Sequence, residues 1–464
     1  MIKYLVLIFV ALSGLSYGQN YKIEVNLKSA ANKEVNLAYY YISNIYIKDT
    51  IQLDNNGFGI FEGDSLLPQG LYKIYLNDAN HFDFLLGADQ DFKLTNETFS
   101  VNDLKVEGAV ETEEFAKYMV YLEGLQKKNR ELQTEYQSAT GEEKKKIGEE
   151  MDQMTNSLHN YWKNINEKYP DTFLAKFLMA NLIPTLDIST LPDEVLNNDS
   201  LLLAARFNYQ KEHYWDNFDY TDERFLYTPL FKPKLEAWFT KALYQNYDSV
   251  KPYVFELIEN TRPHKQIFQF VTAWFLNTTI TSNVMGMDAL FINLAKKYYL
   301  SGEAYWAGED TMDKIKENVR FIENNLIGMT APDLTLESVD GEYFNLHRIE
   351  SKYTLLLIFE PNCSHCNVYV PDFHKRVYEK FKDKGLKVYA IYSMDKRDEW
   401  EDFLYKNNLY DWINVWDPQN MSNFKILYDA RTTPGVYLLD ENKKIVGKKM
   451  SVDQLLAFFE HELN

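Results

Sequence analysis

The feature that most constrains this 464-residue chain is its pair of cysteines, which stand together as Cys363-Ser364-His365-Cys366. No other cysteine is present, which excludes a disulfide scaffold. A bridge across a two-residue gap would also restrict the unfolded chain very little. A continuous apolar run, residues 353–359, precedes the pair and predicts a buried strand, and residues 368–381 after it have the pattern of an amphipathic helix. The pair therefore lies where a strand turns into a helix.

This position favours redox chemistry at the cysteines. The first sulfur is expected near the unpaired amides of the helix N-terminus. These amides and the helix dipole favour the thiolate, which is the reactive form of cysteine. Two neighbouring thiols can also accept and return two electrons. The sequence thus predicts a redox site, against the alternative of two incidental surface cysteines.

The start of the chain indicates export. A basic first segment, an apolar run over residues 4–12 and small residues at Ser16 and Gly18 predict a secretory signal peptide over residues 1–18. No cysteine follows the cleavage site, so a lipid anchor is not expected there. No later segment has the ~20 apolar residues that a membrane span requires. We therefore expect a periplasmic or secreted protein whose mature chain does not insert into the membrane.

Length and charge restrict the organisation and the partners. A chain of 464 residues is too long for a single hydrophobic core, so we expect several domains. The net charge of −19 argues against nucleic acids and anionic membrane surfaces as partners.

The hydrophobic period changes twice along the chain. Residues 20–106 alternate in short runs, which predicts a β-sandwich-like domain. Residues 111–322 have helical spacing, which predicts an all-α domain that begins with a long helical hairpin. An aromatic cluster in it, Phe207 to Tyr220, fits either a ligand groove or, as we expect, a core. From residue 323 to 464 strands alternate with helices, with strands expected at 353–359, 386–392, 413–416 and 436–439 and helices at 365–382, 397–406 and 452–461.

At this point the chain resembles a known family. Residues 328–464 resemble a thioredoxin-fold α/β domain of the TlpA/ResA type, the exported thiol-disulfide oxidoreductases. The matching segments are the stretch from Gly328 to Asp333, the cysteine motif with Pro371 after it, and Thr432-Thr433-Pro434-Gly435 before a strand. The layout also resembles multidomain exported proteins common in Bacteroidetes-type bacteria, in which a β-rich domain and a helical domain precede the thioredoxin-like unit.

The resemblance implies roles for individual residues. Cys363 would attack the disulfide of a partner protein, and Cys366 would resolve the mixed disulfide, leaving a redox-active Cys363–Cys366 disulfide. His365 would add positive charge beside Cys363 and lower its pKa, unless it is a solvated turn residue. Pro434 matches the family's cis-proline, which would turn the backbone of Thr433 toward the sulfurs. Partners would then be protein thiols and disulfides together with a periplasmic or membrane redox donor, and no cofactor or metal is expected.

The sequence departs from the family at three places that hold acids or tryptophan in relatives. Leu357 replaces thioredoxin's buried acid, Asn362 replaces the tryptophan before the first cysteine, and Tyr369 replaces a glutamate common in ResA-like proteins. Glu360 is the nearest carboxylate in sequence and could relay the proton of Cys366, or could serve only at the surface. The direction of electron flow is therefore left open.

Three other functions compete with this interpretation. A peroxiredoxin shares the fold but has a threonine three residues before its reactive cysteine, where this chain has Glu360. A copper chaperone would need a further histidine near the pair, with His347 and His374 as candidates. A peptide- or glycan-binding periplasmic protein would work through residues 20–322, with the redox unit secondary.

Overall fold

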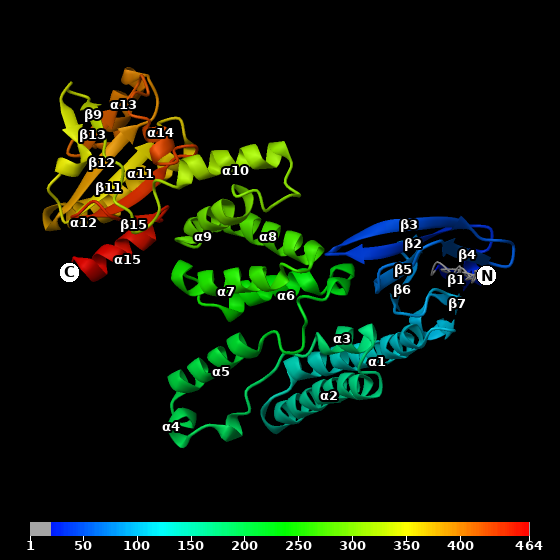
Figure 1. The fold of residues 1–464 in the computed structure, drawn as a ribbon. Helices are drawn as coiled ribbons and strands as arrows, with labels where there is room; N and C mark the ends of the chain where they lie inside the picture. The colour runs from blue at the N-terminus through cyan, green and yellow to red at the C-terminus, as the bar shows by residue number, and fades with distance from the viewer. Residues whose placement is uncertain (1–19, 464) are drawn as a thin grey trace, which may run out of the picture. The chain divides into compact units, whose positions relative to one another are not determined.

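The computed structural model describes residues 20–463 (Figure 1), so the predicted signal peptide lies outside the described chain. This part of the chain divides into two compact units, the first ending at Leu243 and the second beginning at Tyr244. The boundary falls within the predicted helical region. The limits proposed for the three domains, 20–106, 111–322 and 323–464, stay predictions. Within residues 20–463, no helix has the length and apolar character needed to cross a membrane.

The first unit begins with the predicted β-sandwich-like domain. Two four-stranded sheets, ordered β4-β1-β7-β8 and β3-β2-β5-β6, share one core that includes Ile23, Phe61 and Phe84. The edge strand β3 was not predicted, because its residues are mostly exposed and show no apolar alternation. The strands are β1 (Tyr21–Asn26), β2 (Glu34–Tyr41), β3 (Asn44–Gln52), β4 (Phe58–Gly63), β5 (Gly70–Asn77), β6 (Asn80–Leu86), β7 (Asp91–Thr95) and β8 (Lys105–Glu107).

Helices make up the rest of the first unit and the start of the second. The predicted long hairpin is α1 (Val110–Ser138) and α2 (Gly141–Lys168). In the aromatic cluster, Tyr214 and Phe218 are buried, so this part of the cluster belongs to a core, whereas its other aromatic side chains are half-buried. The other helices of the first unit are α3 (Phe173–Met179), α4 (Asp193–Leu196), α5 (Asp199–His213) and α6 (Phe231–Ala237), which continues as a π-helical turn. The second unit starts with α7 (Tyr247–Thr261), α8 (Lys265–Ile280), α9 (Met287–Leu294) and α10 (Glu309–Ile322).

The chain ends in the predicted α/β domain. Its seven-stranded sheet has the order β10-β9-β13-β12-β11-β14-β15, in which β11, β12 and β13 are parallel and β14 runs antiparallel to β11. The central strand β11 (Tyr353–Phe359) has the predicted bounds. The others are β9 (Thr335–Ser338), β10 (Tyr343–Asn345), β12 (Leu386–Tyr392), β13 (Ile413–Trp416), β14 (Gly435–Asp440) and β15 (Ile445–Lys448).

Side chains of β11 alternate between two buried layers, which is why this strand is apolar throughout. On one face Leu355 and Leu357 pack with residues of α11 (Ser364–Phe373), α13 (Arg397–Asn407) and α15 (Val452–Glu462). On the other face Leu356 and Ile358 pack with residues that include Phe424 of α14 (Phe424–Leu427). A strand held on both faces gives the loop that follows it a fixed starting point.

The helix after the cysteines differs from the continuous one predicted over residues 365–382. Helix α11 ends at Phe373, a π-helical turn covers His374–Tyr378, and α12 (Glu379–Phe381) follows. Pro371 lies inside α11. Because proline lacks the N–H that would continue the hydrogen-bond ladder, a break in regular geometry close to it is expected.

Candidate functional site

The first cysteine lies where the sequence predicted it. Strand β11 ends at Phe359, and Cys363 is the residue that caps the N-terminus of α11. The backbone N–H of Cys366 donates to Sγ of Cys363 at 3.4 Å. The sulfur therefore occupies the place of an ordinary capping oxygen, where an anion is stabilised by the helix amides.

The two sulfurs have opposite environments. Partial burial raises the pKa of Cys363, but hydrogen bonding to Thr433 and from the backbone amides of Cys366 and His365 outweighs it, so the net shift is downward. Cys366 is fully buried, and burial raises its pKa to about 12. Both thiols are free. The pair thus combines a half-buried thiol that ionises readily with a buried one that keeps its proton.

The loop before β14 lies against the pair. The Thr433–Pro434 peptide bond is cis, as the resemblance implied. The Cys363 thiol donates to the carbonyl oxygen of Thr433 at 3.3 Å. Hydrogen bonding to Thr433 also lowers the pKa of both thiols. Thr433 therefore contacts the reacting sulfur through its backbone carbonyl.

The remaining predicted residues take different positions. His365 acts on Cys363 through its backbone amide. Glu360 accepts a hydrogen bond from the Ser393 hydroxyl at 2.8 Å, so its carboxylate is held at the end of β11. Leu357, at the position of thioredoxin's acid, is fully buried in the apolar core.

Two further residues bear on the site: Ser393 was not predicted from the sequence, and Tyr369 was noted there only as a departure from the family pattern. Ser393 follows β12 and orients Glu360. Tyr369 is half-buried in α11 with its hydroxyl donating to the carbonyl of Met450 at 2.8 Å. The burial raises the pKa of Tyr369, so it is a neutral hydrogen-bond donor where relatives of the ResA type carry a glutamate.

The two histidines considered for a copper site do not join the cysteines. His347 bonds the carbonyl of Ala331 through Nε2 at 2.7 Å. His374 lies eleven residues after Cys363, beyond the end of α11, which at about 1.5 Å per residue puts it roughly 16 Å along the helix.

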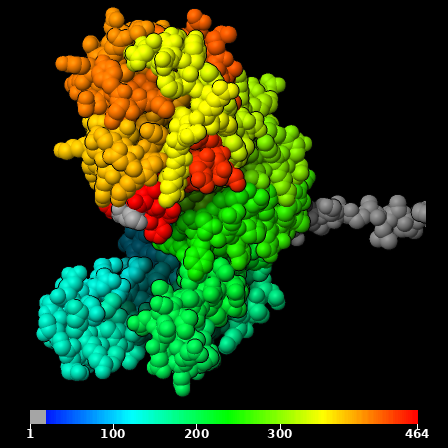
Figure 2. Space-filling view, turned by 90° about the vertical axis from the view of Figure 1, so that its left-hand side faces the viewer, coloured from blue at the N-terminus to red at the C-terminus, as the bar shows by residue number. Residues whose placement is uncertain are grey.

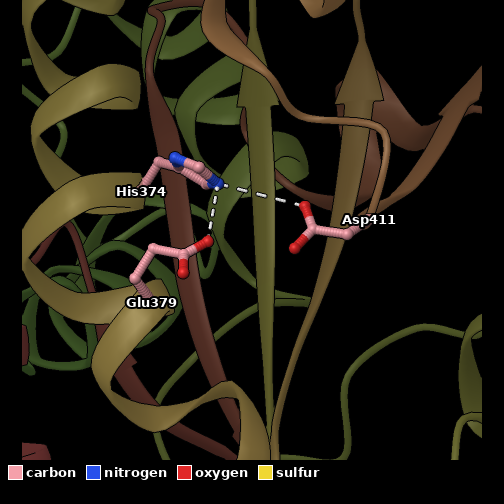
Figure 3. A group of neighbouring side chains, drawn as sticks. All are labelled: His374, Glu379 and Asp411. Atoms are coloured by element: carbon pink, nitrogen blue, oxygen red, sulfur yellow. Dashed lines mark ion pairs between the residues drawn. The ribbon is translucent and has the colours of Figure 1, made fainter.

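His374 belongs to a separate group of ionisable side chains (Figure 3). Its Nε2 lies 3.5 Å from a carboxylate oxygen of Glu379 and 3.9 Å from one of Asp411. The three ligand atoms lie within 4.8 Å of one another, a spacing that a metal ion could bridge. However, Lys382 already pairs with Glu379 at 2.8 Å and with Asp411 at 3.7 Å. The chain's own ammonium group therefore already compensates part of the negative charge that a metal ion would need.

Fold and site together define a thioredoxin-like thiol-disulfide oxidoreductase domain: a mixed sheet, an unequal thiol pair at a helix N-terminus and a cis-proline loop facing it. Residues 327–448 match the AhpC/TSA family, and this part of the chain belongs to that family. Residues 140–324 match a domain of unknown function, DUF5106. No curated protein matches the chain.

Solved structures from several bacteria are similar to parts of the chain. One is described as a domain of a possible thiol-disulfide isomerase from Cytophaga hutchinsonii, with 34% identity, 30% of this chain and 92% of that chain covered, and a TM-score of 0.28. Another is the thioredoxin domain of a thiol-disulfide oxidoreductase from Bacteroides vulgatus, with 27% identity, 30% and 98% covered, and a TM-score of 0.28. A thioredoxin-like protein from Bacteroides caccae covers more of this chain, 60%, and 98% of its own length, at 20% identity and a TM-score of 0.48.

Proposed function

We propose that the protein is an exported thiol-disulfide oxidoreductase that exchanges disulfides with protein substrates through Cys363 and Cys366. The observation that carries the proposal is the difference between the two thiols. The half-buried one has a lowered pKa, and the buried one has a pKa raised to about 12. A nucleophile must be exposed and ionised, whereas the resolving thiol must stay protonated until the mixed disulfide has formed.

In the reducing direction the exchange has two steps. The Cys363 thiolate attacks one sulfur of the partner's disulfide, which forms a mixed disulfide and releases the partner's other sulfur as a thiolate. Cys366 then loses its proton and attacks Sγ of Cys363, which forms the Cys363–Cys366 disulfide and releases the partner's second thiolate. Two electrons pass from the pair to the partner, and the reverse sequence oxidises a dithiol partner. A periplasmic or membrane redox donor would return the pair to its starting state.

Thr433 and Glu360 have supporting roles in this scheme. Hydrogen bonding to Thr433 lowers the pKa of both thiols, so this residue would stabilise the negative charge as it moves from one sulfur to the other. Glu360, oriented by Ser393, would accept the proton of Cys366. The TlpA/ResA-like affiliation and the periplasmic or secreted location belong to the same proposal. They are supported by the cysteine motif, the cis-proline and the signal-peptide pattern of residues 1–18.

Insulin reduction tests the proposal. The mature full-length protein with dithiothreitol as reductant should reduce the interchain disulfides of insulin faster than dithiothreitol alone, and Cys363→Ser should remove the acceleration. Ser364→Ala serves as the matched control, because it changes a neighbouring hydroxyl and leaves both sulfurs. No acceleration by the wild-type protein, with insulin or with a small disulfide, would favour the alternative of a binding protein that works through residues 20–322.

A further inference from the structure

Helix α10, in the DUF5106-matching region, holds the loop that faces the reactive sulfur. Arg431, two residues before Thr433, donates to the side-chain oxygen of Asn318 in α10 at 2.8 Å. Its guanidinium also lies over the ring of Phe321, 4.4 Å from the centroid. The Nε of Arg431 also donates to Asp429 at 2.6 Å. The cis-proline loop is therefore attached to a helix outside the thioredoxin-like domain but inside the same compact unit.

A buried lysine makes a second attachment between these parts. Lys448 at the end of β15 donates to Asp288 of α9 at 2.5 Å and to Asn325 at 2.7 Å, and its side chain is only 6% exposed. A buried ammonium group requires such partners. Figure 2 shows the orange-red surface of the domain lying against the green surface of the helices that precede it. The helices thus border the face that carries the cis-proline loop.

A groove runs between these two attachments. A cavity of about 300 Å³ is lined on one side by the α8–α9 loop, residues 281–286, and on the other by Asp429, Lys449 and Gln454. A second cavity of about 390 Å³ is lined by the same three residues and continues to Thr432 and Pro434. The shared lining makes the two cavities one groove, which leads from the α8–α9 loop to the loop beside Cys363.

Within the described part of the chain, the groove presents one free cation, Lys449, beside apolar side chains. Asp288 and Asp429 are paired with Lys448 and Arg431, so they offer no net negative charge. Lys449 is exposed, and among residues 20–463 it has no carboxylate partner within salt-bridge distance. Met285 of the α8–α9 loop is 40% exposed. A groove of this kind is complementary to an extended chain that carries an acidic and an apolar side chain.

We propose that the groove binds an extended, acidic segment of the substrate protein next to its reacting cysteine, and that the α8–α9 loop together with Lys449 selects the substrate. The segment's carboxylate pairs with Lys449 while its apolar side chain packs on Met285. The inference rests on the proposed disulfide exchange and assigns a task to part of the DUF5106-matching region.

The test compares the rates at which the full-length protein reacts with two peptides. Each contains one cysteine in a mixed disulfide with mercaptoethanol, flanked by Glu and Leu in one peptide and by Lys and Leu in the other. The reduced wild-type protein should react faster with the acidic peptide. Lys449→Glu and Met285→Glu should each lower the ratio of the acidic to the basic rate by about threefold to tenfold, the effect of reversing or adding one charge at an exposed contact.

Matched substitutions outside the groove serve as controls. Lys444→Glu makes the same charge change in the turn before β15, and Met421→Glu makes the same change at an exposed methionine that does not line the groove. Both should leave the ratio as in the wild type. Ratios that change equally in all four variants, or in none, overturn the inference. If instead the wild-type protein fails to react even with bis(2-hydroxyethyl) disulfide, the proposed exchange function itself is wrong.

Discussion

At the residue scale, the two thiols differ because backbone amides reach one sulfur and apolar side chains surround the other. Sγ of Cys363 accepts from the amide of Cys366, while Cys366 packs among the core residues of the sheet. The lowered pKa of Cys363 means that its reactivity toward alkylating agents falls only when the pH drops below that pKa, which is under the ordinary value for cysteine. Cys366, with a pKa of about 12, should stay unreactive up to alkaline pH.

The contribution of His365 to the pKa of Cys363 can be divided between its backbone amide and its imidazole ring. We expect His365→Pro to raise the pKa of Cys363, because proline lacks the N–H that bonds to the sulfur, and His365→Ala to raise it less. The rate of iodoacetamide alkylation against pH, measured in a Cys366→Ser background, gives both values. The reduction potential should fall in parallel as the thiolate loses stabilisation. An equal rise in both variants would assign the effect to the imidazole charge instead.

Removal of the proton from Cys366 should depend on Glu360. Because the thiol with a pKa of about 12 is protonated near neutral pH, the resolving step needs a base. We expect Glu360→Gln to slow the decay of the mixed disulfide by about 100-fold near pH 7, with the deficit shrinking as pH rises and hydroxide replaces the carboxylate. Stopped-flow measurement of that decay tests this.

Glu399→Gln is the matched control for Glu360→Gln. Glu399 is a second carboxylate near the cysteine motif, where it accepts from Asn362 at 3.0 Å, but it already pairs with Lys396 at 2.8 Å. Glu399→Gln should change the decay rate of the mixed disulfide little. Similar decay rates for Glu360→Gln and the wild-type protein at every pH would contradict the relay.

At the scale of secondary-structure elements, local patterns could be predicted and distant pairings could not. The apolar run that forms β11 and the capping position of Cys363 are local signals, and both were predicted. The contact of Cys363 with Thr433 joins residues 70 positions apart and was expected only from the family resemblance. The ion pair of Lys448 and Asp288 joins residues 160 positions apart. Such a distant pair produces no periodic pattern in the sequence, so it could not be predicted.

That pair joins β15 to α9, and its loss should destabilise the second unit. Asp288→Ala leaves the buried ammonium of Lys448 without its carboxylate and should lower the free energy of unfolding by about 3 kcal/mol. Asp313→Ala is the control, since Asp313 pairs with Lys316 at the surface and its removal should cost under about 1 kcal/mol. Urea unfolding measures both. Equal losses would show that the buried pair does not hold these elements together.

At the scale of the whole molecule, the residues that carry the thiol chemistry occupy a shorter stretch of the chain than the compact unit around them. All the residues of the proposed reaction follow residue 327, whereas the compact unit that contains them begins at Tyr244. The helices between these points supply Asn318 and Asp288, which bond to Arg431 and Lys448. The helical region is thus part of the support of the site.

Two fragments of the chain test whether the thiol chemistry needs the helices that precede the thioredoxin-like domain. Residues 323–464 and residues 244–464 should both be soluble and should both reduce bis(2-hydroxyethyl) disulfide at close to the rate of the full chain, because both contain the complete thiol site. The shorter fragment lacks Asp288 and Asn318, so it should unfold at a lower urea concentration than the longer one. A shorter fragment that is insoluble, or inactive on this small disulfide, would show that the preceding helices complete the active site.

The central claim is that Cys363 is the nucleophile of a disulfide exchange and Cys366 the residue that resolves it. The most direct measurement is the intact mass of full-length Cys366→Ser and of full-length Cys363→Ser after incubation with insulin. We expect Cys366→Ser to carry an insulin chain in a bond that dithiothreitol releases, and Cys363→Ser to carry none, because its remaining thiol is buried and protonated. Equal adducts on the two variants, or adducts on neither, would contradict the account.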